Sequence, residues 1–257
     1  MASDIVSITC PDCDSTFSTK ITYEMDFKWK MPGGMVLFIA NGVDWSLCAE
    51  IFFDKCYDVA FNRLRELAPA NRPLRVVDLG ANVGFFTLLA ADVMALKQQQ
   101  FLVECVEPSS KNLQTLLYRL SNQAKETPGS FKIIAGAVGR ERSGEAMFHT
   151  TDFHPTCTLE NIPNTKTGEE IVSYIDLDNL IQPGTIDFLK CDIEGSEEGF
   201  TKIYQDTLLK RVQNCIMEVH ADRVRIDNIL EHMCNAGFTK ATEVFSRGLV
   251  SLWFWSR

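Results

Sequence analysis

From Leu74 onward, short β-rich runs alternate with helical patterns, and this alternation most strongly limits how the chain can fold. Apolar runs predict the strands, and the segments between them carry apolar residues at helical spacing. Consecutive strands joined by helices predict a mostly parallel sheet that is covered on both faces. The strands are expected at residues 74–80, 101–108, 131–139, 186–194 and 214–220, and the helices at 85–98, 109–124, 196–211 and 225–238.

The C-terminal end departs from this rhythm. "FTKATEVFS" and "SLWFWSR" are two strand-like runs that are joined by "RGLV", with no helix between them. Such a pair predicts a hairpin, so the sheet is expected to finish with an antiparallel edge. The aromatic residues 253–255 are expected in the core, because a strand buried on both faces reads as continuous apolar sequence.

Residues 1–73 do not follow the alternation and are interpreted as an N-terminal cap on the sheet. The cap is predicted to contain a hairpin that turns at Pro32–Gly34 and a helix over residues 46–67. The main domain then covers residues 74–257. It includes an insertion at about 140–173, which is polar and rich in turn residues and suits a loop or lid over a site.

Composition excludes several classes of protein. The net charge is −9, from 25 basic and 34 acidic residues, and no basic stripe is present, which argues against a nucleic-acid partner. The longest apolar runs are too short or too interrupted for a membrane span, and the N-terminus lacks the features of a signal peptide. Several of the nine cysteines sit inside apolar runs, which favours reduced thiols and a cytoplasmic location. Cys10 and Cys13 lack a second close pair, so a loop is favoured over a zinc site.

The stretch "VVDLGANVGFF", residues 76–86, lies where a buried strand is expected to end and a helix to begin. Glycine at Gly80 and Gly84 permits a tight turn and a close approach of a ligand to the helix N-terminus. Asn82 replaces the middle glycine of the dinucleotide pattern, where it hinders a pyrophosphate. A ligand without phosphates, such as S-adenosylmethionine, is therefore favoured. Glu107 can accept hydrogen bonds from ribose hydroxyls in either cofactor class, so a nicotinamide oxidoreductase stays open as an alternative.

Several ordered motifs together resemble the FkbM-type S-adenosylmethionine-dependent methyltransferases. They are "VVDLGANVGFFTLLA", "VECVEPSSKNLQTL", "YIDLDNLIQPGTIDFLKCDIEGSEEGF" and "IMEVH", and they span roughly Leu74 to His220. The resemblance implies an α/β, Rossmann-like class I methyltransferase fold, with a mostly parallel seven-stranded sheet and a C-terminal antiparallel hairpin. It also implies methyl transfer from S-adenosylmethionine to an oxygen, on a sugar or a secondary metabolite.

The resemblance further implies which residues bind the cofactor. The methionine end would be contacted from the glycine turn, the ribose from the end of the second strand, and the adenine from the end of the third. The residues of these three regions are Asp78, Gly80, Ala81, Asn82 and Gly84, then Glu107 and Pro108, then Ala137 and Val138. Asp192 completes the expected set.

Two clusters are candidates for removing the proton of a hydroxyl acceptor. Asp192 and Glu194 end the fourth strand, and Glu218 and His220 end the fifth, so both clusters are expected at the same rim. His220 is the leading candidate for the base, because an imidazole titrates near neutral pH. Asp192 would orient the donor's ammonium or the acceptor, and Glu218 would assist His220.

The remaining histidines and Glu197 are expected to have structural or minor roles. His149 and His154 are weaker candidates for substrate contacts, His232 is expected to be structural, and Glu197 is interpreted as a helix-dipole partner.

Asp192, Glu218 and His220 could also hold a divalent metal, but nothing in their spacing demands one, and no metal is expected. The expected partner is a small molecule with a hydroxyl acceptor. A non-catalytic interaction protein with this fold is the second alternative. The identity of the acceptor and the oligomeric state stay open.

Overall fold

The computed structural model describes residues 2–9, 16–23, 27–69, 71–123, 127–150, 158–159 and 168–257, and for 2–9 and 16–23 it describes the backbone alone. Cys10, Cys13 and His154, which the sequence singled out, lie outside the described residues.

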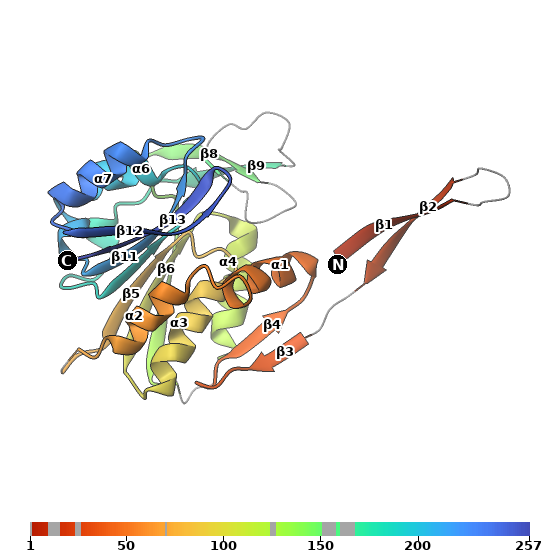
Figure 1. Cartoon of the computed structure of the whole chain (residues 1–257), viewed down its shortest axis with the longest axis horizontal. Coiled ribbons are helices and arrows are strands. Elements are labelled where there is room, and N and C mark those ends of the chain that lie inside the picture. Colours follow the sequence, from red (N-terminus) through yellow and green to blue (C-terminus); the bar gives the residue numbers. More distant parts are fainter. Residues whose placement is uncertain are drawn as a thin grey trace.

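A seven-stranded sheet forms the centre of the molecule (Figure 1). Its strands lie in the order β12-β13-β11-β10-β5-β6-β7. The five strands from β11 to β7 are parallel, and β13 is antiparallel to both β11 and β12. Their bounds are β5 Leu74–Leu79, β6 Phe101–Glu107, β7 Gly129–Ala135, β10 Phe188–Cys191, β11 Asn214–His220, β12 Lys240–Arg247 and β13 Val250–Ser256. The expected class I methyltransferase fold is confirmed, including its antiparallel C-terminal hairpin.

Helices cover both faces of the sheet, which explains why the central strands read as continuous apolar runs. One face packs against α1 Gly42–Phe52, α2 Asp58–Glu66, α3 Phe85–Leu96 and α4 Ser110–Ser121. The other packs against α5 Leu177–Leu180, α6 Glu197–Tyr204, the 3₁₀ turn Leu208–Arg211 and α7 Ile226–Asn235. Val76 of β5 faces the first layer and Val77 faces the second, and both are fully buried.

Within the described ranges, three small hairpins lie outside the main sheet. They are β1 Ala2–Thr9 with β2 Thr16–Tyr23, β3 Phe27–Lys30 with β4 Val36–Ile39, and β8 Glu145–Thr150 with β9 Gly168–Ser173. The β3–β4 pair turns at the predicted Pro32–Gly34, where Gly34 has a φ of 98°. The β8–β9 pair lies in the segment that was predicted as a loop or lid, so part of this insertion is regular structure.

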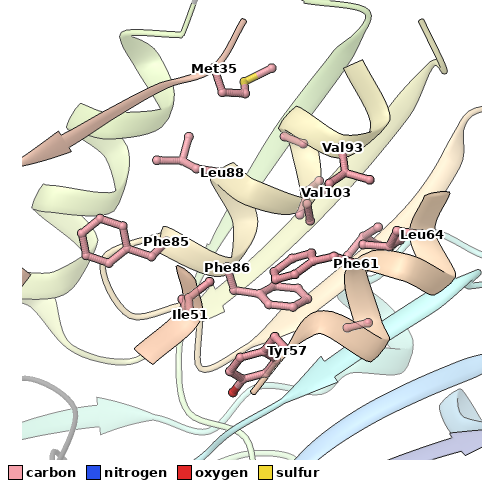
Figure 2. Close-up of a cluster of buried hydrophobic side chains, with 14 of the residues drawn as sticks. Met35, Ile51, Tyr57, Phe61, Leu64, Phe85, Phe86, Leu88, Val93 and Val103 are labelled. Atoms are coloured by element: carbon pink, nitrogen blue, oxygen red, sulfur yellow. The ribbon is translucent and has the colours of Figure 1, made fainter. Parts of the chain in front are cut away.

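The N-terminal segment is joined to the sheet through α3. Figure 2 shows Tyr57 and Phe61 beside Phe86, with Leu64 further along the same helix. The ring of Phe86 lies 5.3 Å from that of Phe61 and 5.4 Å from that of Tyr57, centroid to centroid. All three side chains are buried, so α2 and α3 share one core.

Several predicted elements end differently from what the sequence suggested. The third strand, expected over 131–139, stops at Ala135, and Gly136 follows it with a φ of 152°. The helix expected over 46–67 is two helices, because the chain turns between them with Lys55 in the left-handed region at a φ of 57°. The fourth strand stops at Cys191 rather than 194, and the turn that follows has Glu194 and Gly195 in the left-handed region. The helix expected over 196–211 ends at Tyr204 and continues after a turn as the 3₁₀ segment.

Candidate active site

A pocket lies at the carboxyl ends of the parallel strands, where ligands bind in open α/β sheets. Its walls come from the ends of β5, β6, β7, β10 and β11, from the N-terminal segment, and from the segment around β8. The lining residues are Leu47, Glu50, Ile51, Tyr57, Gly80, Ala81, Asn82, Val83, Phe85, Phe86, Val106, Glu107, Pro108, Asn112, Gly136, Ala137, Val138, Phe148, Leu159, Lys190, Asp192, Ile193, Glu194 and Glu218.

The turn after β5 owes its shape to three left-handed residues. Gly80, Asn82 and Gly84 have φ values of 70°, 50° and 91°. A Cβ on Gly80 would overlap the backbone oxygen of Asp192, so this position requires glycine for space as well as for conformation. Asparagine is one of the few other residues that adopt the left-handed region readily, which explains Asn82 between the two glycines.

Glu107 closes one end of the pocket and is tied to that turn. Its Oε2 accepts a hydrogen bond from the backbone N–H of Asn82 at 2.8 Å. Its Oε1 accepts from the backbone N–H of Ser109 at 3.0 Å and from the side-chain amide of Asn112 at 3.2 Å. Burial raises the pKa of Glu107 to about 7, although these three donors pull the pKa down. Glu107 is therefore a carboxylate that gains or loses its charge near neutral pH.

Lys190 of β10 lines the pocket and contacts the turn after β5. Its ammonium donates to the backbone oxygen of Gly80 at 2.7 Å and lies 3.4 Å from Asp78 Oδ1 and 3.5 Å from Asp192 Oδ2. Burial alone would lower the pKa of Lys190, but the carboxylates of Asp78 and Asp192 raise it overall. The lysine is therefore a permanent cation that fixes the glycine turn against β10.

The opposite end of the pocket is acidic. Glu50, Asp192, Glu194 and Glu218 all line it. Burial, followed by the charge of Asp192, raises the pKa of Glu50 and of Glu218. The hydroxyl of Tyr57 donates to Glu218 Oε2 at 3.3 Å. Figure 2 shows this hydroxyl directed away from the apolar cluster in which the ring is packed.

His220 lies behind this end and does not line the pocket. Its Nδ1 is 3.0 Å from Glu197 Oε1, and its Nε2 is 3.3 Å from Glu194 Oε2 and 3.7 Å from Glu218 Oε1. Burial alone would lower the pKa of His220, but the hydrogen bonds to Glu194 and Glu197 raise it to about 11. The imidazole is therefore cationic at neutral pH, and this geometry does not favour His220 as the group that accepts a proton.

Most of the residues predicted to bind the cofactor lie together in the pocket walls. They are Gly80, Ala81, Asn82, Glu107, Pro108, Ala137, Val138 and Asp192, and Glu218 is with them. Asp78 and Gly84 are not among the lining residues. Asp78 is fully buried and accepts a hydrogen bond from Thr87 at 2.6 Å. Gly84 is the N-cap of α3, where a Cβ would lie 2.7 Å from Leu116. The two residues flank the turn between β5 and α3 and contribute to its structure rather than to the pocket wall.

The other histidines that the sequence singled out occupy different places. His149 on β8 is buried, with Nδ1 3.4 Å from Glu169, and its neighbour Phe148 is the residue that reaches the pocket. Nδ1 of His232 on α7 lies 3.1 Å from the hydroxyl of Thr201. Glu197, interpreted as a helix-dipole partner, is also the fully buried partner of His220.

Sequence reasoning missed Glu50, Tyr57 and Lys190 as pocket residues. Glu50 and Tyr57 come from the N-terminal segment, whose position relative to the sheet no local pattern reveals. Lys190 carried a usable signal, because a lysine inside the apolar run "FLKC" requires buried partners.

The family model for the methyltransferase FkbM domain matches residues 78–240, which include the glycine turn and three residues of the acidic end of the pocket, Asp192, Glu194 and Glu218. The chain belongs to the FkbM methyltransferase family. The comparison with curated proteins returned no match.

Solved structures of methyltransferases are similar at low sequence identity. An FkbM methyltransferase from Methylobacillus flagellatus KT is 14% identical, with a TM-score of 0.46 over 78% of this chain and 59% of its own. Precorrin-6y C5,15-methyltransferase from Geobacter metallireducens GS-15 is 12% identical, with a TM-score of 0.44 over 78% and 87%. TrmK of M. capricolum, solved with S-adenosylhomocysteine, is 9% identical, with a TM-score of 0.42 over 77% and 67%.

No helix within the described ranges is long and apolar enough to cross a membrane.

Proposed function

We propose that this FkbM-family protein transfers a methyl group from S-adenosylmethionine to a hydroxyl oxygen of a small molecule such as a sugar or a secondary metabolite. The observation that carries the proposal is that one pocket has carboxylates at both of its ends. Glu107 provides a ribose-binding carboxylate at one end, and Asp192 and Glu218 provide carboxylates for the reacting groups at the other.

Unpartnered acceptor atoms support S-adenosylmethionine as the ligand. Among the lining residues, Asn82 Oδ1, Asn112 Oδ1 and Asp192 Oδ1 are buried and have no hydrogen-bond partner. S-adenosylmethionine carries donors that match them: its ammonium, its two ribose hydroxyls and its adenine amine. A pyrophosphate would instead bring negative oxygens toward these acceptors and toward Glu107, and buried acceptors that face one another are unfavourable. The hydrogen-bond acceptors of the pocket therefore fit a sulfonium nucleoside better than a nicotinamide dinucleotide.

The residues present suggest how the cofactor would be held. Glu107 Oε2 accepts one hydrogen bond in the protein, which leaves it capacity for a ribose hydroxyl. Ala137, Val138 and Phe148 supply apolar surface for the adenine. Asp192 Oδ1 is suited to the ammonium of the methionine part, while Lys190 holds the other oxygen of Asp192.

When bound, S-adenosylmethionine supplies an electrophilic methyl group, which passes to the acceptor oxygen as the bond to sulfur breaks and its electron pair stays on sulfur. The protein aligns the two partners, and this alignment supplies much of the rate. The proton of the hydroxyl must also be removed. Glu218 is the carboxylate best placed for that step, because Glu194 is paired with Arg223 and Asp192 with Lys190.

A raised pKa makes Glu218 a stronger proton acceptor than an ordinary carboxylate, and burial is the main cause of this rise. The cationic His220, 3.7 Å away, stabilises the negative charge of Glu218 before the proton arrives. His220 then has an electrostatic role, in place of the role of base that its intrinsic pKa suggested.

The proposal is tested with methyl-labelled S-adenosylmethionine and a panel of sugars, polyketides, peptides and RNA as acceptors. We expect label in an acceptor with a free hydroxyl group. Glu218→Gln should lower turnover by about 100-fold or more, as loss of a general base usually does, while binding of S-adenosylhomocysteine is retained. Label on nitrogen or carbon would overturn the proposed acceptor, and unchanged turnover in the variant would remove Glu218 from the proton transfer.

A further inference from the structure

We propose that Tyr57, the N-cap of α2, is a positioning residue for the proton transfer, because its hydroxyl holds the carboxylate of Glu218 in one orientation. Tyr57 thereby takes part in the step that the proposed function assigns to Glu218, on which this role rests. The reaction end of the pocket is then completed by a side chain from the N-terminal segment, which precedes the family-matched residues 78–240.

The backbone around Tyr57 brings its side chain both to the core and to the pocket. The chain turns between α1 and α2 with Lys55 in the left-handed region, two residues before Tyr57. The ring of Tyr57 is 5% exposed, and its centroid lies 5.4 Å from that of Phe86. Figure 2 shows the ring within the apolar cluster and the hydroxyl pointing out of it. The core therefore fixes the ring, and the ring fixes the place of the hydroxyl.

The hydroxyl is the part of Tyr57 that the apolar core does not use. A phenylalanine ring would pack against Phe86 equally well, whereas a buried hydroxyl has a desolvation cost that a partner must offset. Among the described residues, the acceptor that this hydroxyl reaches is Glu218 Oε2, at 3.3 Å. The two residues are 161 positions apart in the chain. The hydroxyl thus acts on one carboxylate of the pocket wall.

Glu218 is held at both of its oxygens by groups from different elements. Tyr57 of the N-terminal segment donates to Oε2, and the cationic His220 of β11 lies 3.7 Å from Oε1. Contacts at both oxygens limit the rotation of the carboxylate. A general base needs a lone pair directed at the proton that it accepts, and a base that is already oriented loses less freedom in reaching the transition state. Removal of the hydroxyl releases one of the two oxygens.

The charges around Glu218 explain why a neutral donor is useful there. Burial, followed by the charge of Asp192, raises the pKa of Glu218, and a hydrogen bond donated to the charged form opposes this rise. Burial, followed by the charge of Glu218, raises the pKa of Tyr57, so the phenol stays protonated and remains a donor. The charged and titratable groups that face Glu218 come from α1, the turn before α2, β10 with the turn after it, and β11. They are Glu50, Cys56, Tyr57, Lys190, Asp192, Glu194 and His220.

The first measurement is the titration of Glu218 by NMR in the full chain with ¹³C-labelled glutamate, without cofactor or acceptor. Glu218→Gln identifies the signal. In Tyr57→Phe we expect the midpoint at higher pH, because the charged form has lost a donor. Tyr204→Phe is the matched control and should leave the midpoint unchanged. Tyr204 is also buried, its hydroxyl bonds to the backbone of Leu177 and Ile175, and none of these three residues lines the pocket.

The second measurement is methyl transfer to the hydroxyl acceptor that takes up label. Tyr57→Phe should lower kcat by about tenfold, the lower end of the effect of losing a hydrogen bond to a charged group. The acidic limb of the pH profile of kcat should move to higher pH, which a merely structural role would not produce. The Kd for S-adenosylhomocysteine should change by less than about twofold, because Tyr57 lies at the reaction end of the pocket. Tyr204→Phe should alter none of these values.

Two results would overturn the role of Tyr57. One is an unchanged midpoint of Glu218 in Tyr57→Phe, and the other is a shifted midpoint with unchanged kcat and pH profile. If Tyr57→Phe does not fold, the unaltered protein with ¹³C at the tyrosine Cζ decides. One tyrosine signal should then move with the midpoint of Glu218 and stay still in Glu218→Gln, and its absence would refute the contact. A shifted midpoint in a protein that methylates no hydroxyl would instead refute the proposed function, so the two failures are distinguishable.

Discussion

At the scale of single residues, Glu107 links the turn after β5 to the end of the pocket that we propose for the ribose. It accepts three hydrogen bonds from Asn82, Ser109 and Asn112 while lying buried at the end of β6. A carboxylate that is already oriented by the protein loses little freedom on binding a ligand, which makes each of its hydrogen bonds more effective.

Glu107→Gln should weaken binding of S-adenosylhomocysteine by about 10- to 100-fold, because a hydrogen bond to a charged group is worth about 1.5–3 kcal/mol. Isothermal titration calorimetry measures the change. The matched control is Glu66→Gln, since Glu66 is an exposed carboxylate on α2 that is paired only with Arg63 among the described residues. Binding that is equally weak in both variants, or unchanged in both, would contradict the role of Glu107.

The affinity for S-adenosylhomocysteine should also rise between pH 6 and pH 8. Burial raises the pKa of Glu107 to about 7, so the carboxylate is neutral below that pH and charged above it. The charged form is the better acceptor for ribose hydroxyls, and below the pKa the affinity should fall by up to about tenfold per pH unit. Titrations across this range measure the slope, and Glu107→Gln should flatten it.

Lys190→Met should destabilise the fold by about 3–5 kcal/mol, the usual effect of leaving a buried carboxylate without its partner. Asp78 is fully buried, and Lys190 is its ion-pair partner among the described residues. The free energy of unfolding in urea measures the change. Asp78→Asn combined with Lys190→Met should recover part of the loss, and a double variant that is less stable than either single variant would contradict the pairing.

At the scale of secondary-structure elements, the N-terminal segment is part of the pocket as well as of the core. The break between α1 and α2 brings Tyr57 to Glu218, while the ring of Tyr57 packs against Phe86 (Figure 2). Glu50 of α1 lines the same end. Substrate contacts are therefore expected from a segment that precedes the matched family region.

Phe61→Ala tests how firmly this segment is attached. Phe61 is 2% exposed and packs against Phe86, so its truncation should destabilise the protein by about 3–5 kcal/mol. Phe53→Ala is the control, because Phe53 is 66% exposed and should change the free energy of unfolding by only a few tenths of a kcal/mol. Urea unfolding measures both variants, and equal losses would mean that α2 does not share the core of the sheet.

The elements that the sequence predicted correctly are those whose burial pattern is repetitive. β5, β6 and β11 lie between two layers and read as apolar runs, and α3 begins at a glycine turn. The ends of elements were less predictable where one residue leaves the regular conformation. By residue type, the strand β10 could have continued to Glu194, but it ends at Cys191, and Glu194 lies in a turn with a φ of 54°.

The candidate site was predictable only in part, for a related reason. Asn82 and Glu107 carry local signals, since one interrupts a glycine pattern and the other ends a strand. His220 was recognised by its position, but its protonation depends on Glu194 and Glu197, which reach it from another element. An intrinsic pKa read from residue type cannot contain such contacts, so the preferred base moved from His220 to Glu218.

At the scale of the whole molecule, the parallel sheet gathers five strand ends at one edge and so places the carboxylate of Glu107 and the acidic end in one pocket. This edge is rich in hydrogen-bond acceptors and poor in cationic side chains. Lys190, which lies there, is already paired with Asp78 and Asp192. The molecule as a whole is also acidic, with a net charge of −9. Both features favour a ligand that carries positive charge over one that carries phosphates.

Calorimetric titration of the full chain with S-adenosylhomocysteine, and separately with NAD, tests this central claim most directly. The account predicts saturable binding of one S-adenosylhomocysteine per chain and no measurable binding of NAD at the same concentrations. Binding of NAD without binding of S-adenosylhomocysteine would contradict it, and the assignments of Glu107, Asp192 and Glu218 would then have to be made anew.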